Sequence, residues 1–324
     1  MFKFSKFALA AAALITLGGQ ASASDVWNMP TPYPDGNFHT VNIKTFADDV
    51  RAATKGELDI KIHSAGSLVK HPEIKNAVRQ GLVPIGEFFL SRLSNENPVF
   101  GIDSIPFLAT NYDEAKRLWD ASRPTIESEL KKQHLKVLFS VPWPPQGLYA
   151  KKEITSLSDL KGIKMRAYNA LTERLAHLSG AVPTQVEVPD IPQAFATGQV
   201  EAMITSPSTG ANSKAWDFVN NFIDVQAWIP KNIVIVNAKA YDKLSDASKA
   251  AINKAAAAAE MRGWEASKAE TAAKIKILTD NGMNVSSPTP ELLKGLKEAG
   301  AEMTADWVKA SGEAGKSILS AYQK

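Results

Sequence analysis

The sequence contains no cysteine, no long run of like charge and, after its N-terminus, no long apolar run. The absence of cysteine excludes disulfides, thiol catalysis and cysteine-ligated metal sites. Lysine and arginine are scattered and matched by acidic residues, with a formal net charge of +3, so no basic face for nucleic acid is indicated. No stretch beyond the N-terminus is apolar for long enough to cross a membrane.

The N-terminus itself has the pattern of a signal peptide. Lys3 and Lys6 form a short positive segment, residues 7–17 are apolar, and "ASA" at positions 21–23 matches a signal-peptidase site. We expect cleavage after Ala23 and export to the periplasm, with residues 1–23 removed. A retained membrane anchor is the alternative, although the apolar segment is short for a bilayer span.

Motifs of known enzyme chemistry are missing as well. There is no G-x-S-x-G nucleophile motif and no P-loop. The histidines follow no zinc-ligand spacing; they are His39, His63, His71, His134 and His177. An enzyme that used Glu87 as its acid–base would lack a partner nucleophile or a metal cluster. We therefore expect a protein that is not an enzyme and needs no cofactor and no metal.

What the sequence does contain is an alternation of short apolar runs and amphipathic helical patterns, which predicts an α/β fold. The length favours two domains. Residues 112–135 read mostly as a helix that Pro124 interrupts. Residues 245–282 read as one helix, rich in alanine, in which Gly263 could introduce a bend. At ~1.5 Å per residue this helix would span roughly 50 Å, long enough to join two lobes.

Polar and aromatic residues gather where the predicted strands end. Ligands of open α/β sheets bind beyond the carboxyl ends of the strands. Arg166 is a natural receptor for a carboxylate, because its planar guanidinium matches two carboxylate oxygens. From the pattern alone, a structural ion pair between Arg166 and a nearby acidic residue stays equally open. The candidate binding residues are Glu87, Phe88, Trp143, Gln146, Tyr149, Arg166, Asn169, Ser206 and Trp228.

Several segments, in the right order over nearly the whole mature chain, resemble the solute-binding proteins of tripartite ATP-independent periplasmic (TRAP) transporters. "ITSLSDLKGIKMRAYNA" is similar to the most specific motif of that family. "FADDVRAATKGELDIKIHSAGSL", "EIKNAVRQGLVPIGEF", "DSIPFLATNYDEAKRLWD" and "AFATGQVEAMITSP" resemble its other segments. The resemblance implies a two-lobed α/β periplasmic binding protein fold, with the ligand cleft between the lobes and a long connecting helix. Lobe I would comprise residues 24–145 and about 231–262, and lobe II about 146–230 and 263–324.

The resemblance also implies roles for individual residues. Arg166 stands where the family keeps the arginine that pairs with the ligand's carboxylate. Glu87 stands at an acidic pocket position, and Ser206 at a position where many members have asparagine. Tyr149 takes the place of a second arginine, which implies one carboxylate clamp and an aromatic lining with Trp143, Trp228 and Phe88. We therefore expect a monocarboxylate with an apolar or aromatic body, or a 2-oxo acid, rather than a dicarboxylate.

The implied partners are a small organic acid and the integral membrane subunits of a TRAP transporter, with no nucleic acid. We expect the protein to be a monomer. A ligand-sensing protein that reports to a signalling receptor is the alternative, and the sequence does not separate it from the transport function.

Overall fold

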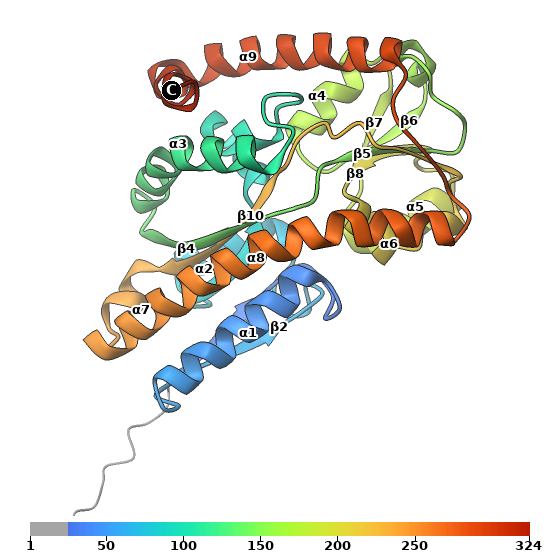
Figure 1. Cartoon of the computed structure of the whole chain (residues 1–324). Helices are drawn as coiled ribbons and strands as arrows, with labels where there is room; N and C mark the ends of the chain where they lie inside the picture. Colours follow the sequence, from blue (N-terminus) through green and yellow to red (C-terminus); the bar gives the residue numbers. More distant parts are fainter. Residues whose placement is uncertain (1–24) are drawn as a thin grey trace, which may run out of the picture.

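The computed structural model describes residues 25–324, and the predicted signal peptide lies outside them. The described chain forms two α/β lobes with a long helix along one side (Figure 1). Within this part of the chain, no helix is both long enough and apolar enough to span a bilayer. The predicted fold class is confirmed.

The first lobe is built on two small sheets that lie side by side. One is the parallel pair β1 (Asp25–Pro30) and β2 (Leu58–His63); in the other, β10 (Lys231–Asn237) runs antiparallel between β3 (Ile85–Phe89) and β4 (Leu135–Pro142). The helices of this lobe are α1 (Phe38–Ala53), α2 (Ile74–Gln80), α3 (Tyr112–Lys131) and α7 (Ala238–Asp242). Short 3-10 helices η1 (His71–Glu73), η2 (Leu90–Asn95) and η3 (Pro98–Ser104) follow the strand ends.

The second lobe contains one mixed sheet with the strand order β11-β9-β5-β8-β6-β7. Its strands are β5 (Gly147–Ala150), β6 (Lys164–Ala167), β7 (Val182–Gln185), β8 (Ala202–Thr205), β9 (Asn221–Ile223) and β11 (Asn284–Ser286). Its helices are α4 (Ala170–Leu178), α5 (Ile191–Ala196) and α6 (Pro207–Asn212), with 3-10 helices η4 (Leu157–Leu160), η5 (Val188–Asp190) and η6 (Ala215–Asp217).

Two chain segments cross between the lobes and are hydrogen-bonded to each other. The Trp143 amide donates to the Pro230 carbonyl (2.8 Å), and the Gln146 amide donates to the Trp228 carbonyl (3.0 Å). The Ala227 amide donates back to the Gln146 carbonyl (2.9 Å). This two-stranded crossing, residues 143–146 with 227–230, is the hinge. Side chains on it lie between the two lobes.

A third connection is α8 (Asp246–Asp280), a helix of 35 residues. It packs on α1 and β4 of the first lobe and on α6 and β11 of the second. Its backbone is helical throughout, so Gly263 does not interrupt the helix. A Cβ atom at Gly263 would lie 2.4 Å from Val141 Cγ2 and 2.8 Å from Asn42 Nδ2. Glycine is therefore needed for the close approach of α8 to the first lobe.

The prediction that Pro124 interrupts the helix is wrong, because Pro124 lies inside the continuous helix α3. Proline removes one backbone donor there. Buried apolar side chains on both sides, including Trp119 and Ile126, hold the two halves of α3 on the same core. This packing outweighs the local helix-breaking tendency.

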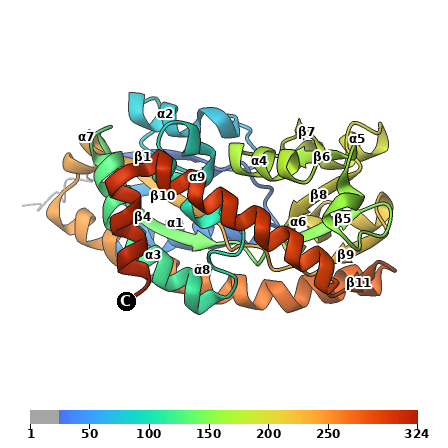
Figure 2. The same ribbon diagram turned by 90° about the horizontal axis from the view of Figure 1, so that it is seen from above.

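The C-terminal helix α9 (Pro290–Tyr322) lies across both lobes, as Figure 2 shows from above. It contacts α3 and η3 of the first lobe and α4 and η4 of the second. Its helical backbone breaks at Gly312, whose φ of 58° favours glycine.

Candidate functional site

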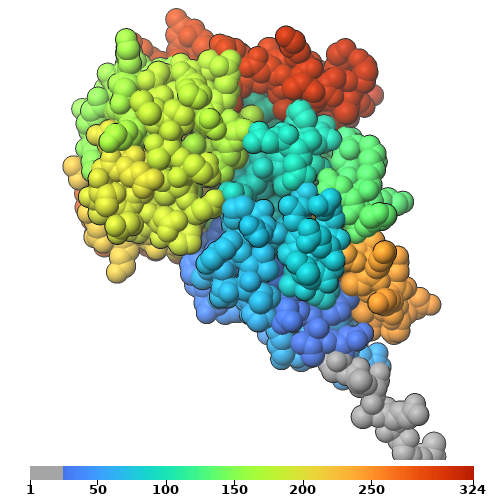
Figure 3. Space-filling view, turned by 180° about the vertical axis from the view of Figure 1, so that it is seen from behind, coloured from blue at the N-terminus to red at the C-terminus, as the bar shows by residue number. Residues whose placement is uncertain are grey.

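A pocket with an empty volume of about 400 Å³ lies between the lobes, beside the hinge. In Figure 3 the atoms of the second lobe, in yellow and green, abut the blue and cyan atoms of the first, so on that face the lobes are closed together. The lining residues are Tyr33, His71, Phe89, Arg92, Trp143, Gln146, Arg166, Tyr168, Glu187, Val188, Thr205, Ser206 and Thr209.

Arg166 lies on β6, a strand that pairs with β8 on one side and with β7 on the other. It lines the cleft near the carboxyl end of this strand. Its side chain is only 2% exposed. Nε donates to the Val186 carbonyl (2.9 Å), and the guanidinium carbon lies 5.0 Å from the centre of the Tyr168 ring. Across residues 25–324, no acidic side chain lies within ion-pair distance of it. The structural ion pair that the sequence left open is therefore not found.

Burial lowers the pKa of Arg166 to about 10, although Tyr168 and Glu187 oppose that shift. At neutral pH the guanidinium is still charged. A buried cation without a close counter-ion is costly, and a ligand anion that pairs with it recovers that cost. Arg166 is therefore prepared to receive an anion.

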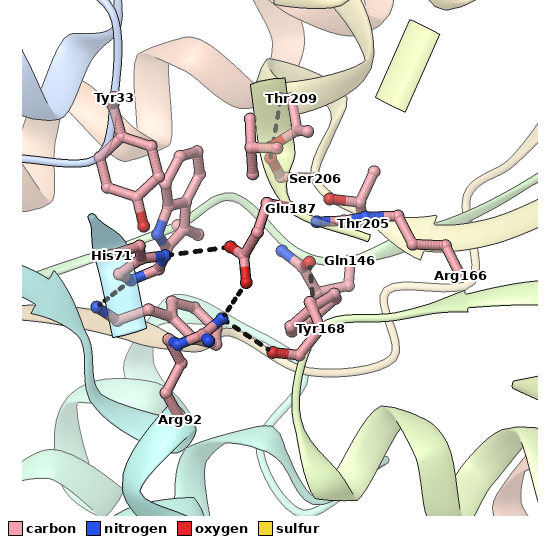
Figure 4. A pocket seen from close by; sticks show the side chains of 13 residues that line it. Tyr33, His71, Arg92, Gln146, Arg166, Tyr168, Glu187, Thr205, Ser206 and Thr209 are labelled. Carbon is pink, nitrogen blue, oxygen red and sulfur yellow. Dashed lines mark hydrogen bonds and ion pairs between the residues drawn. The ribbon is translucent and has the colours of Figure 1, made fainter. Parts of the chain in front are cut away.

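A second arginine, Arg92, is already paired across the cleft. Its Nη1 donates to Glu187 Oε1 (2.8 Å) and to the Tyr168 carbonyl (3.4 Å). His71 Nδ1 lies 3.5 Å from Glu187 Oε2, while His71 Nε2 accepts from the Phe89 amide (3.2 Å). Because Nε2 is an acceptor, the proton of the neutral imidazole belongs on Nδ1, where it points to Glu187. Figure 4 shows this arrangement.

The ionisation of these groups follows from their contacts. Burial acts to raise the pKa of Glu187, but the hydrogen bond from His71 and the charge of Arg92 outweigh it and lower that pKa to about 2. Burial also lowers the pKa of His71. Around neutral pH the pocket therefore holds two arginine cations and one carboxylate.

The wall opposite Arg166 is aromatic and is held from behind by a buried polar network. Tyr33 Oη and Trp143 Nε1 both donate to Asn232 Oδ1, at 3.1 and 2.9 Å. Asn232 Nδ2 donates to Glu87 Oε1 (3.2 Å), and Thr31 Oγ1 donates to Glu87 Oε2 (2.6 Å). The network orients the Asn232 amide, and through it the two rings that face the ligand space.

Four of the predicted site residues line the pocket: Trp143, Gln146, Arg166 and Ser206. Ser206 also has a structural task, because its Oγ accepts from the Thr209 amide (3.0 Å) and caps α6. The side-chain Nε2 of Gln146 donates to the Pro144 carbonyl (2.8 Å). The side-chain Oε1 of Gln146 accepts from Tyr168 Oη (3.5 Å).

The structure places the other five outside this lining; they are Glu87, Phe88, Tyr149, Asn169 and Trp228. Tyr149 is fully buried under α6, where it packs on Phe222 and its Oη donates to the Ser206 carbonyl (3.2 Å). Asn169 caps α4 and donates from Nδ2 to Ser91 Oγ (2.7 Å) of the first lobe. Trp228 is buried on the hinge.

Pocket residues that the sequence reasoning missed include Arg92, Tyr168 and Glu187. Each comes shortly after the end of a strand: Arg92 after β3, Tyr168 after β6 and Glu187 after β7. The rule that selected Arg166 would have found them if it had been applied to every strand. The described residues contain no group of three or more His, Asp or Glu side chains that could hold a metal ion. What the pocket does present is a fixed cation, hydrogen-bonding groups and aromatic surface.

Comparison with known proteins identifies the family. Residues 32–310 match the model of DctP, the bacterial extracellular solute-binding proteins of family 7. The chain belongs to this family. It is an extracytoplasmic solute-binding protein of the TRAP type and not an enzyme.

At least three solved family members share more than two fifths of their sequence with this chain. DctP7 of Bordetella pertussis, described as an extracytoplasmic solute receptor binding pyroglutamic acid, is 46% identical with a TM-score of 0.92, covering 93% of this chain and 100% of its own. A marine metagenome TRAP solute-binding protein specific for pyroglutamate, with the co-purified ligand, is 43% identical with a TM-score of 0.91. The match covers 93% of this chain and 99% of that protein's chain.

A more distant relative is the sialic acid-binding periplasmic protein SiaP of Vibrio cholerae. It is 22% identical over 284 residues, which are 86% of this chain and 88% of SiaP. The family therefore spans different ligands on one fold, and the ligand of a member depends on its pocket.

Proposed function

We propose that this DctP-family receptor binds pyroglutamate or a closely similar small monocarboxylate, with Arg166 as the carboxylate receptor. The observation that carries the proposal is the buried guanidinium of Arg166, which lines the cleft and has no carboxylate partner among residues 25–324. The relatives at 46% and 43% identity that bind pyroglutamate support the choice of ligand.

Pyroglutamate has the chemistry that such a pocket favours. Its single carboxylate would pair with the two Nη atoms of Arg166, since Nε is used by Val186. Its lactam N–H and C=O need an acceptor and a donor. The carboxylate of Glu187, the carbonyl oxygen of Gln146 and the hydroxyl groups of Thr205 and Thr209 all line the space. The flat ring would lie against Trp143 and Tyr33.

The test is calorimetric titration of the mature chain, residues 25–324, after unfolding and refolding to remove any co-purified ligand. Pyroglutamate is compared with proline, a 2-oxo acid and glutarate. We expect pyroglutamate to bind most tightly. Arg166→Ala should weaken its binding by roughly 10²- to 10³-fold, as expected for loss of one partner of a buried ion pair.

The matched control is Arg174→Ala. Arg174 is another arginine of the second lobe, but it pairs with Glu302 and Asp306, lies outside the pocket and is half-exposed. It should leave the dissociation constant unchanged. If the Arg174 and Arg166 variants bind equally well, the carboxylate is held elsewhere. If the refolded wild type binds none of the acids, the ligand assignment is wrong.

We further propose that the loaded receptor delivers its ligand to TRAP membrane subunits and acts as a monomer. Family membership supports the partner. Transport of labelled pyroglutamate by cells or proteoliposomes that contain both components would test delivery. Uptake that is independent of this receptor would overturn it.

A further inference from the structure

The pocket contains two arginines but only one of them is available to a ligand. Arg92 donates to Glu187 Oε1 at 2.8 Å, and His71 occupies the other oxygen of the same carboxylate. Arg166 has no such partner within the described chain. Figure 4 shows Glu187 in view between Arg92, which comes from the first lobe, and Arg166, which comes from the second.

Glu187 is held in place by several contacts rather than by one flexible ion pair. Arg92 binds it from η2, His71 from η1, and its own backbone leads directly into η5. The Arg92 side chain is 17% exposed and that of Glu187 29% exposed. Their charges therefore meet in a partly desolvated space, where they are screened less than on the surface.

The charge balance of the pocket follows directly. Arg92 and Glu187 neutralise each other, His71 is neutral, and Arg166 leaves a single positive charge. One ligand carboxylate makes the closed pocket neutral. A second carboxylate would find Arg92 occupied and would lie near the Glu187 carboxylate, and like charges in such a space repel strongly.

We propose that the Glu187–Arg92 pair is the specificity element that restricts this receptor to monocarboxylates, with Arg92 as a second carboxylate clamp that Glu187 keeps occupied. This proposal rests on the proposed function, because it takes Arg166 as the receptor for the first carboxylate. Selectivity of this kind combines an attractive element, Arg166, with a repulsive one, Glu187.

The test replaces Glu187 and measures a dicarboxylate directly. Glu187→Gln keeps the side-chain shape but removes the charge, and Glu187→Ala removes the ion-pair partner of Arg92 altogether. Glutarate and pyroglutamate are titrated into the wild type and both variants. We expect the dissociation constant of glutarate itself to fall by about tenfold or more, the scale of one hydrogen bond to a charged group, so that its ratio to the pyroglutamate dissociation constant falls because glutarate binds more tightly.

Two further variants make the interpretation specific. Combining Arg92→Gln with Glu187→Gln removes the freed clamp, so glutarate binding should return to its wild-type weakness. Glu96→Gln is the matched control, because Glu96 also forms an ion pair with a cation of the first lobe, Lys75, but lies outside the pocket. It should leave the ratio unchanged.

A parallel loss of affinity for both ligands in the Glu187 variants would mean that the pair only holds the lobes together, and it would overturn the proposal. So would a gain of glutarate binding that persists without Arg92. The glutarate arm can be measured even if pyroglutamate is not the ligand. If the wild type does not bind pyroglutamate but a Glu187 variant binds glutarate more tightly than the wild type does, the ligand assignment is wrong. The role of the Glu187–Arg92 pair in specificity is then still supported.

Discussion

Arg166 and Glu87 are both almost completely buried in this receptor, and their surroundings give them different roles. Arg166, at 2% exposure, faces the empty cleft and has no acidic partner in the described chain. Glu87, at 1% exposure, is surrounded by Thr31, Asn232 and His39 behind the aromatic wall. The first is placed to meet a ligand, whereas the second supports the residues that do.

We predict that Glu87 makes the stability of the protein depend on pH. Burial raises its pKa from 4.5 to about 7. Between these values the folded protein keeps a proton that the unfolded chain releases, so the free energy of unfolding falls as pH rises from about 4.5 to 7 and then levels off. The contribution is on the order of 3 kcal/mol.

Urea unfolding of the wild type and Glu87→Gln at pH 5 and pH 8 measures this effect. The uncharged glutamine should be relatively more stabilising at pH 8 than at pH 5, because only there does the wild type carry a buried carboxylate. Taking the difference between the two proteins removes the contribution of groups that titrate in both. An equal difference at both pH values would show that the pKa of Glu87 is not raised in the folded protein, and it would contradict the prediction.

At the scale of elements, the lobes are joined by close contacts that depend on small residues. The helix α8 approaches β4 and α1 at Gly263, where the space for a Cβ atom is filled by Val141 and Asn42. The Asn42 side chain in turn donates to the Ala259 carbonyl (2.9 Å) on α8. This contact fixes the helix on the first lobe, while its C-terminal half packs on the second.

We predict that Gly263→Ala destabilises the protein although alanine favours helices. The gain in helix propensity is about 1 kcal/mol, whereas overpacking at this contact costs about 1–3 kcal/mol. Thermal and urea unfolding would measure the change. Thr279→Ala, at an exposed position of the same helix, is the control and should be neutral or slightly stabilising. An increase in stability for Gly263→Ala would contradict the prediction, because it would show that α8 can move away from β4 without destabilising the protein.

At the scale of the whole molecule, closure depends on direct contacts between the lobes. Besides the Arg92–Glu187 pair, Asn169 Nδ2 of the second lobe donates to Ser91 Oγ of the first at 2.7 Å, and both residues are buried. In an open form the Asn169 amide would be hydrated. The hydrogen bond therefore counts toward closure and hence toward ligand affinity.

We predict that Ser91→Ala weakens all ligands by a similar factor, roughly 5- to 100-fold, because it leaves a buried amide without a partner in the closed form only. Calorimetry with pyroglutamate and with a weaker acid would test this. Ser122→Ala is the control: its hydroxyl donates to the Leu118 carbonyl inside α3, so it should alter stability but not affinity. A ligand-dependent effect of Ser91→Ala would place Ser91 in the recognition of the ligand itself.

Local signals were sufficient for much of the fold. The alternation of short apolar runs and amphipathic helical patterns predicted the α/β class, and the alanine-rich pattern predicted α8. Predictions that depended on a neighbouring element were less secure. Pro124 does not break α3, because packing against the lobe core holds both halves of that helix. Tyr149 belongs to β5, where side chains on both faces are buried, so alternation could not tell cleft from core.

The sequence by itself determined the α/β class, the family and the position of Arg166, because these depend on periodicity, on contiguous motifs and on one residue near a strand end. Only the tertiary structure decided which charges meet. Arg92 and Glu187 are 95 residues apart and pair because the closed lobes bring the ends of β3 and β7 to one cleft. Tyr149 turns toward Phe222, because α6 covers that face of the sheet. Such pairings follow from the packing of distant elements, which local sequence patterns do not encode.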